Sequence, residues 1–282
     1  MAATSMKDIK LRIKSVESTM QITKAMQLVA TSKLRRAKER METSRPYAEI
    51  ARQAVTAAAL SCDDPTVPYI TLQNRQKDCY IIIAGERGLA GGYNNNLFKA
   101  QLSHAEGKEY CVLPIGRKAI EKYTRVGAEL LSDEFAGVEG LSVSKCYKIA
   151  KMLLDKFKAG AFGNLYLVYT SFKTMMSQEV EIAQLLPLIT DDSGLKAKPV
   201  STVYDPGAAE VLEKIVPDYL AGTLYSAVCN SFLSEVASRR SAMDSATKNA
   251  GEMISDLRLK FNRARQGAIT QEITEIVAGA EQ

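Results

Sequence analysis

Residues 6–45 read MKDIKLRIKSVESTMQITKAMQLVATSKLRRAKERMETSR, a stretch without glycine or proline that is typical of a long helix. Two rows of residues recur every seven positions, at alternating spacings of four and three, which is the pattern of a coiled-coil seam. The rows are Ile13, Met20, Gln27, Leu34, Met41, Ala48 and Ile9, Val16, Thr23, Ala30, Ala37, Ser44. We predict a helix over residues 6–60, roughly 80 Å long at 1.5 Å per residue, with Pro46 as a candidate kink.

The other end of the chain has a matching pattern. Its rows are Val236, Met243, Ala250, Leu257, Ala264 and Thr247, Ile254, Phe261, Ala268. No proline follows Pro217, which is well placed in a first helical turn. We therefore predict a second long helix within residues 207–282 that pairs with the first as an antiparallel coiled coil. The segment 61–206 then returns the chain from one helix to the other.

The predicted seam has a polar interruption at Thr23 and Gln27, where both rows lose their apolar character. Apolar residues lie on other faces of the helix nearby, namely Ile22, Met26 and Val29. A helix that is apolar away from its partner must contact something further. The second helix also ends in an apolar stripe that the shorter first helix cannot cover, formed by Ile269, Ile273, Ile276 and Ala280. We expect this C-terminal tip to be buried in another protein.

Between the two helices, short apolar runs alternate with helical patterns. The predicted strands are residues 78–84, 110–115, 164–171, 179–186 and 199–204, and the predicted helices are residues 95–105, 117–126 and 143–159. Strands that alternate with helices are typical of an α/β domain. The predicted fold is therefore a central Rossmann-like α/β sheet domain with two long helical arms. Residues 191–198, DDSGLKAK, are expected to form a polar hairpin or loop.

The most enzyme-like motif is GERGLAGG at residues 85–92, because it follows a buried strand and precedes a helix. Backbone amides at such a turn can bind phosphate. The motif lacks the Walker lysine followed by serine or threonine, and its spacing is not G-x-G-x-x-G. A strand-to-helix turn that needs glycine is the favoured interpretation, and a nucleotide site is the alternative.

Other residues that could carry chemistry are sparse. His104 is the single histidine, and it is expected to be exposed near the end of a predicted surface helix. The cysteines have no C-x-x-C spacing, which argues against a zinc framework: Cys62, Cys79, Cys111, Cys146 and Cys229. We expect them to be buried thiols in a reducing compartment. We predict no catalytic residue, metal ligand or cofactor.

The positive charge is concentrated at the N-terminus. Residues 1–60 hold 12 Lys and Arg against 5 Asp and Glu, a net charge of +7, whereas the whole chain has +5. An acidic protein or nucleic acid could bind such a surface. Residues 1–46 have no aromatic side chain for base stacking, which favours the acidic protein. The longest apolar run, residues 79–85, is far shorter than the ~20 residues of a membrane span, so no transmembrane segment is expected.

Three parts of the chain together resemble the gamma subunits of F-type ATP synthases. They are residues 6–36, which include TMQITKAMQLVATSKLRR, residues 85–98 (GERGLAGGYNNNLF), and residues 243–280 (MDSATKNAGEMISDLRLKFNRARQGAITQEITEIVAGA). The resemblance implies a central stalk that turns inside three alpha and three beta subunits and couples proton or sodium flow to ATP synthesis or hydrolysis. It also implies delta and epsilon subunits and a membrane c-ring as partners, and neither nucleotide nor nucleic acid bound to this chain itself.

The resemblance gives single residues a role. Contacts with beta map to Lys24, Met26, Arg87, Arg265, Gln266 and Thr270. The tip residues Ile269, Ile273 and Ile276 would sit in a bearing, and Tyr204 would lie at the foot toward epsilon and the membrane ring. Ala90 stands where many members have cysteine, so no thiol chemistry is expected at that turn.

The N-terminus and the middle domain suggest a location. Chloroplast-type members have an insert with a regulatory cysteine pair, and residues 186–206 have no cysteine and no room for it. Residues 1–5 are too short for a transit peptide, and no secretory signal is evident. We expect a peripheral complex on the cytoplasmic face of a bacterial plasma membrane, with the matrix side of the mitochondrial inner membrane as the alternative.

Overall fold

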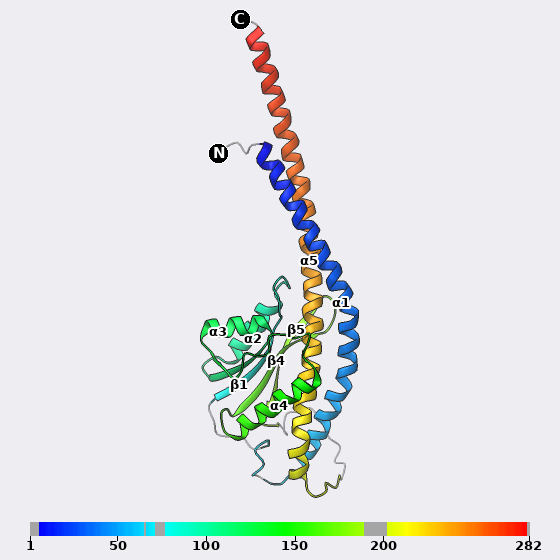
Figure 1. Ribbon diagram of the computed structural model, residues 1–282, viewed down its shortest axis with the longest axis vertical. Helices are drawn as coiled ribbons and strands as arrows, with labels where there is room; N and C mark the ends of the chain where they lie inside the picture. The colour runs from blue at the N-terminus through cyan, green and yellow to red at the C-terminus, as the bar shows by residue number, and fades with distance from the viewer. Residues whose placement is uncertain (1–5, 65, 71–76, 189–201, 281–282) are drawn as a thin grey trace. The chain divides into compact units, whose positions relative to one another are not determined.

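The computed structural model describes residues 6–64, 66–70, 77–188 and 202–280 (Figure 1). Contacts divide the chain into two units. The arm unit comprises Met1–Thr31 and Arg239–Gln282, and the α/β unit comprises Ser32–Ser238. Each of the two long helices contributes residues to both units.

The described chain begins and ends with two long helices, α1 (Met6–Leu60) and α5 (Ala208–Ala280). Helix α1 has the predicted bounds and continues through Pro46. The expectation that Pro217 lies in a first turn is wrong, because α5 begins at Ala208 and the proline lies inside it. An internal proline costs about 3 kcal/mol, whereas burying a large aliphatic side chain contributes about 1.5–3 kcal/mol. Leu212 and Val216 are fully buried just before the proline, and their burial offsets its cost.

In the arm unit, the first part of α1 packs along the part of α5 that follows Arg239, and the end of α5 extends beyond the start of α1 (Figure 1). The two segments are antiparallel, because Thr23 bonds Thr247 while the earlier Glu17 pairs with the later Arg258. The predicted seam is confirmed by its buried residues, which are Ile9, Ala30, Met243, Ala250, Ile254 and Leu257. Alanine at two of these positions lets the helices approach closely.

In its described residues, the α/β unit is built on a five-stranded sheet of order β3-β2-β1-β4-β5. Its strands are β1 (Lys77–Ile83), β2 (Glu109–Ile115), β3 (Glu129–Leu130), β4 (Asn164–Phe172) and β5 (Gln178–Leu186). Neighbouring strands are parallel except for β5, which is antiparallel to β4. Four predicted strands are confirmed, and β3 has no predicted counterpart because two residues are too few to show a pattern.

The fifth predicted strand, residues 199–204, is wrong where it can be checked. Residues 202–204 are not in a strand, whereas residues 199–201 and the loop predicted at 191–198 lie outside the described residues. The apolar residues in this stretch mislead because they do not pair with the sheet: Val203 is 90% exposed.

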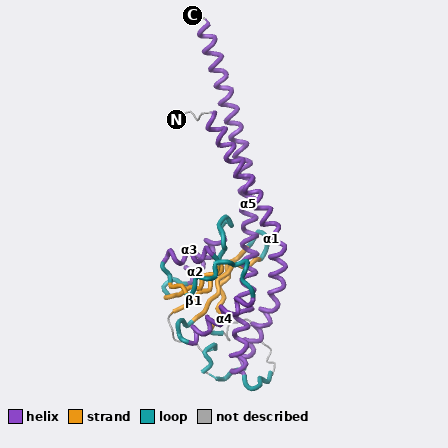
Figure 2. The backbone as a smooth tube through the Cα atoms, in the orientation of Figure 1, coloured by secondary structure: helices purple, strands orange, loops and turns teal. Residues whose placement is uncertain are grey.

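Helices cover both faces of the sheet (Figure 2). The shorter helices, close to their predicted bounds, are α2 (Tyr93–His104), α3 (Arg117–Val126) and α4 (Val143–Lys158). Helices α2 and α3 pack on one face, where Tyr80 and Leu97 are fully buried. Helix α4, the end of α1 and the first half of α5 pack on the other face, where Ile81, Phe157 and Leu224 are buried.

Candidate functional site

Strand β1 ends in a tight turn, residues 85–92, that leads directly into α2. Leu89 and Gly91 have positive φ angles of 60° and 57°. Such a backbone conformation is uncommon for leucine. The Leu89 side chain is also 65% exposed, so it is not held in place by burial. Arg87 is also exposed, whereas Ala90 is buried. The predicted strand-to-helix turn is confirmed, and it presents a cation and a leucine to solvent.

The crevice where sheets of this type bind ligands is filled by α5. Ligands usually bind outside the carboxyl ends of the strands, where the strand order reverses, and here that point lies beside β1. The Ser231 Oγ atom of α5 lies 2.9 Å from the Tyr93 hydroxyl oxygen and 3.2 Å from the Ile83 carbonyl oxygen. A Cβ atom at Gly85 would lie 2.9 Å from Glu235 Oε1. Because the chain's own helix occupies this crevice, the structure favours the turn over the nucleotide site.

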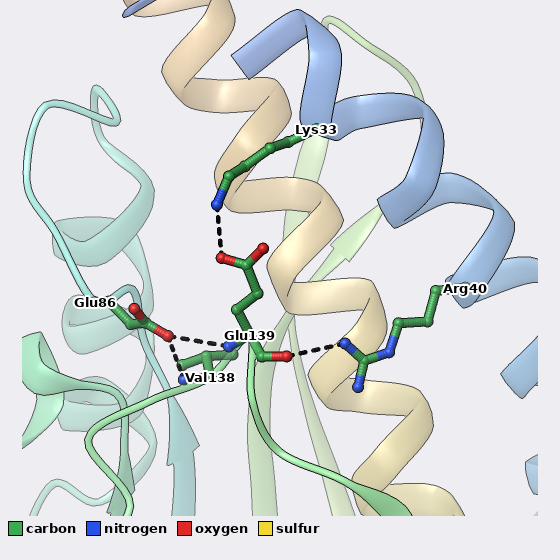
Figure 3. Close-up of polar contacts among 5 residues, drawn as sticks. All are labelled: Lys33, Arg40, Glu86, Val138 and Glu139. Atoms are coloured by element: carbon green, nitrogen blue, oxygen red, sulfur yellow. Dashed lines mark hydrogen bonds and ion pairs between the residues drawn. The ribbon is translucent and has the colours of Figure 1, made fainter. Parts of the chain in front are cut away.

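Residues 135–141, between β3 and α4, form a segment that we call the strap (Figure 3). On one side the strap is bonded to the turn after β1. The Glu86 Oε1 atom accepts hydrogen bonds from the amide of Val138 at 2.6 Å and from the amide of Glu139 at 3.0 Å. A carboxylate thus holds two consecutive backbone amides of the strap.

On its other side, the strap is bonded to α1 (Figure 3). The Glu139 Oε2 atom lies 2.6 Å from the Lys33 ammonium. The Arg40 guanidinium donates to the carbonyl oxygens of Glu139 at 3.0 Å and Leu141 at 2.9 Å, and to the Tyr225 hydroxyl at 3.0 Å. Burial alone lowers the pKa of Arg40, but the Tyr225 hydroxyl and nearby thiols raise it above its usual value. Arg40 is therefore a permanent cation that joins α1, α5 and the strap.

The predicted polar interruption of the seam is confirmed as a pair of contacts across the arm unit. The Thr23 and Thr247 hydroxyl oxygens lie 2.8 Å apart, and the Gln27 amide nitrogen donates to Asp244 Oδ1 at 2.9 Å. Polar pairs inside a mostly apolar seam fix the register of the two helices, because any other register leaves these groups without partners.

The α1 residues around this polar layer mostly face outward. Ile22 and Val29 are 58% and 59% exposed, as the sequence predicts, and Lys24 is exposed beside them. Met26, predicted to lie on an outer face, is instead partly buried. It precedes Gln27 by one position, so its flexible side chain reaches the edge of the seam.

The C-terminal part of α5 carries the remaining arm residues. The exposed residues here include Arg265, Gln266, Thr270 and the three isoleucines Ile269, Ile273 and Ile276. Ile276, at 71%, is the most exposed of the three isoleucines. The prediction that α1 leaves this stripe uncovered is confirmed for the described residues.

Tyr204, the predicted foot residue, lies in the coil before α5. It is partly buried against the core that α4 and α5 form with the sheet. The predicted contact residues therefore divide between the units: Arg87 and Tyr204 belong to the α/β unit and the others to the arm unit.

The expectation that His104 is simply exposed is wrong. Its Nδ1 atom lies 2.8 Å from the Tyr80 hydroxyl oxygen, and its ring packs edge-on against Tyr166. Burial, together with the nearby Lys108 ammonium, lowers the pKa of His104. The helical pattern does not predict this contact because the two tyrosines come from strands β1 and β4.

Metal binding and thiol chemistry find little support in the described parts of the chain. No three His, Cys, Asp or Glu side chains there are placed to hold a metal ion. Four of the five cysteines are buried and Cys62 is partly buried. Burial raises the pKa of Cys146 to about 12, so this thiol stays protonated at neutral pH. None of the described helices combines the length and apolar character needed to cross a membrane.

Comparison with known proteins identifies the family to which the chain belongs. A family model described as ATP synthase matches residues 5–282. The ATP synthase gamma chain of Ruminococcus albus is 45% identical over 278 residues, which cover 96% of this chain and 96% of the relative. The chain belongs to the ATP synthase gamma chain family. The gamma chain of Lachnoclostridium phytofermentans is 41% identical over 285 residues and 98% of each chain.

Solved structures confirm the fold of the gamma chain family. A chain of the Euglena gracilis mitochondrial ATP synthase, in a structure of OSCP, F1 and c-ring, matches with a TM-score of 0.72 and 19% identity. The match covers 97% of this chain and 92% of that one. A rotor chain of the same enzyme matches with a TM-score of 0.68 over 94% of this chain and 98% of its own length.

Sequence reasoning missed the residues that hold the strap. Lys33 and Arg40 belong to the basic segment 1–60, which is expected to face an acidic protein, and Glu86 lies in the glycine motif 85–92 with no role predicted for it. One signal for Glu86 exists, namely a carboxylate directly after the glycine that ends a buried strand. Its partners, Val138 and Glu139, lie more than fifty residues away in sequence, and no local pattern points to them.

Proposed function

We propose that this chain is the rotating central shaft of an F-type ATP synthase, and that it couples proton or sodium flow through a membrane ring to ATP synthesis or hydrolysis at the beta subunits. The observation that carries the proposal is the uncovered end of α5. Ile269, Ile273 and Ile276 are 47%, 56% and 71% exposed. A row of exposed large apolar side chains marks a surface that a partner buries. A ring of subunits around the tip would provide that partner.

The seam and the charge distribution support the same function. Two helices with buried alanines and a polar layer of fixed register form a stiff pair, which a shaft that carries torque requires. The net charge of +7 on residues 1–60 suits acidic surfaces on surrounding subunits. In this proposal the segments 1–60 and 207–282 form the shaft, and the α/β segment 61–206 lies toward the membrane ring.

Specific residues would make the contacts with beta. On the arm unit these are Lys24, Met26, Arg265, Gln266 and Thr270, most of which are exposed in the isolated chain. On the α/β unit it is Arg87, in the turn after β1. A hydrogen bond to a charged group contributes about 1.5–3 kcal/mol, which is enough to favour one rotational orientation and small enough for a driven rotor to break. Tyr204 would lie at the foot, toward epsilon and the c-ring.

The chain itself would be non-catalytic, with no cofactor and no bound nucleotide, and the catalysis would belong to beta. Its partners would be three alpha and three beta subunits, delta, epsilon and the membrane c-ring. The complex would be peripheral, on the cytoplasmic face of a bacterial plasma membrane. The high identity to bacterial gamma chains supports this location over the mitochondrial matrix side.

The test is a set of tip variants in the complete complex, reconstituted into liposomes. Replacing Ile269, Ile273 and Ile276 by serine, or truncating the chain after Ala264, should lower ATP-driven ion pumping per ATP hydrolysed. The α/β unit should stay folded, because these residues lie in the arm unit. Replacing the exposed polar pair Gln271 and Glu275 of the same helix by serine is the matched control. Unchanged assembly and unchanged pumping in both tip variants would refute the proposal.

A further inference from the structure

We propose that the strap, residues 135–141, is a mechanical link that carries load from the exposed turn 85–92 to α1, with Glu86, Lys33 and Arg40 as its positioning residues. The proposal rests on the proposed function, in which Arg87 of this turn contacts beta. It adds how a force applied at that turn reaches the shaft. All of these residues belong to the α/β unit.

The joint at the turn is short and charged. Glu86 directly precedes the exposed Arg87, and its Oε1 atom is bonded to the amides of Val138 and Glu139 at 2.6 and 3.0 Å. Hydrogen bonds to an ionised acceptor are shorter and roughly twice as strong as neutral ones. A displacement of the turn therefore pulls on two consecutive peptide groups of the strap.

The joint at α1 has two attachment points separated by two helical turns. Lys33 binds the Glu139 side chain at 2.6 Å, and Arg40 binds the Glu139 and Leu141 carbonyls at 3.0 and 2.9 Å. Arg40 is also fixed from α5, through the Tyr225 hydroxyl and a cation–π contact of 5.2 Å with the same ring. Two points on one helix resist both sliding and rotation, which a single point would not.

The first residues of the strap are bonded to the segment where β2 ends and α3 begins. The Phe135 and Ala136 carbonyls of the strap accept hydrogen bonds from the amides of Gly116 at 2.8 Å and Arg117 at 3.1 Å. The side chains of Val138 and Leu141 are each 2% exposed. A surface loop of this length usually moves independently of its surroundings, whereas backbone and side chains of the strap are both held.

The geometry at Gly116 shows how closely the strap is seated. This glycine has a φ of +96°, and a Cβ atom there would lie 2.2 Å from the Ala84 carbonyl oxygen and 3.1 Å from a methyl carbon of Val138. Only glycine allows the end of β1, the start of α3 and the strap to meet at this point. The strap is thus packed directly against the residues that follow β1 and β2.

The experiment uses the complete complex in liposomes and compares Glu86→Ala with Glu134→Ala. Glu134 is an exposed glutamate in the connection between β3 and α4 that contains the strap. In Glu86→Ala, hydrogen exchange at the Val138 and Glu139 amides should rise roughly tenfold, since a charge-assisted hydrogen bond to each is lost. Ion pumping per ATP hydrolysed should fall roughly twofold or more, the usual effect of residues along a coupling network. Glu134→Ala should change neither quantity.

A charge swap guards against variants that merely fold badly. Lys33→Glu and Glu139→Lys should each lower pumping per ATP hydrolysed, and the double variant should restore it, because the pair is re-formed with its charges exchanged. Restoration is not expected if either single change acts by unfolding.

Three results would overturn the link. They are unchanged exchange in Glu86→Ala, raised exchange with unchanged pumping, and no rescue by the charge swap. Failure of the proposed function looks different, because the tip variants would then pump like the wild type or the wild-type complex would not pump. If the tip variants lose coupling and Glu86→Ala does not, the shaft stands and the strap is only structural.

Discussion

Replacing Ser231 by alanine should destabilise the α/β unit by about 2–3 kcal/mol. The fully buried hydroxyl lies 2.9 Å from the Tyr93 hydroxyl oxygen, 3.2 Å from the Ile83 carbonyl oxygen and 3.4 Å from the Thr170 amide. Tyr93 keeps its 3.1 Å bond to the Ser231 carbonyl, so the main loss falls on Ile83 and Thr170. Two buried groups that lose a partner at about 1–1.5 kcal/mol each give the stated magnitude.

The measurement is urea unfolding of the full chain followed by tyrosine fluorescence. The chain has 12 tyrosines and no tryptophan, and every tyrosine lies between residues 32 and 238, so the signal reports the α/β unit alone. Ser234→Ala loses one bond, 3.0 Å to the Thr170 carbonyl, and should cost about 1 kcal/mol. Ser241→Ala, at an exposed position of the same helix, should stay within about 0.5 kcal/mol of wild type. If Ser231→Ala cost no more than Ser241→Ala, α5 would not be anchored in the crevice as described.

Three further predictions can be read by the same fluorescence assay. Gly222→Ala would put a Cβ atom 2.4 Å from Tyr47 Cε1 and displace that half-exposed ring. In a Tyr47→Ala background, the same substitution should stabilise α5 by up to ~1 kcal/mol. A stabilising effect of equal size in both backgrounds would contradict the clash. His104 has a lowered pKa in the folded chain, so stability should be constant above pH 6.5 and fall as the pH drops below it; His104→Gln should remove this slope, and an unchanged slope would assign it to another group. Tyr123→Phe removes a 2.7 Å bond to the fully buried Gln101 and should cost about 1–3 kcal/mol, an expectation that a neutral result would exclude.

The long helices and the sheet could be predicted because their signals are local. The seven-residue rows that contain Ala30 and Ala250 report which face of each helix is buried, and that face is the same in the structure. The apolar run of β1 likewise identifies a strand buried on both faces. The place of Pro217 inside α5 could not be predicted, because proline locally favours a first helical turn and the burial of Leu212 and Val216 outweighs this preference.

The contacts that join distant elements were beyond sequence reasoning. Glu86 finds its partners after 52 and 53 residues, and Ser231 reaches Ile83 across 148 residues. Such contacts depend on how the strands are ordered in the sheet, which no periodicity encodes. His104 illustrates the same limit, since its tyrosine partners become neighbours only when β1 and β4 pair.

The helix segment that seals the β1 crevice can be regarded as a ligand that is covalently tethered to its own receptor. Tethering replaces a bimolecular equilibrium by an intramolecular one, with an effective concentration that the connecting chain sets. A small molecule could bind beside Gly85 only if Ser231 and Glu235 of α5 moved away. The free energy needed to displace the helix would then be subtracted from its binding free energy. Ligand binding at this end of the sheet would therefore oppose the packing that holds the α/β unit together.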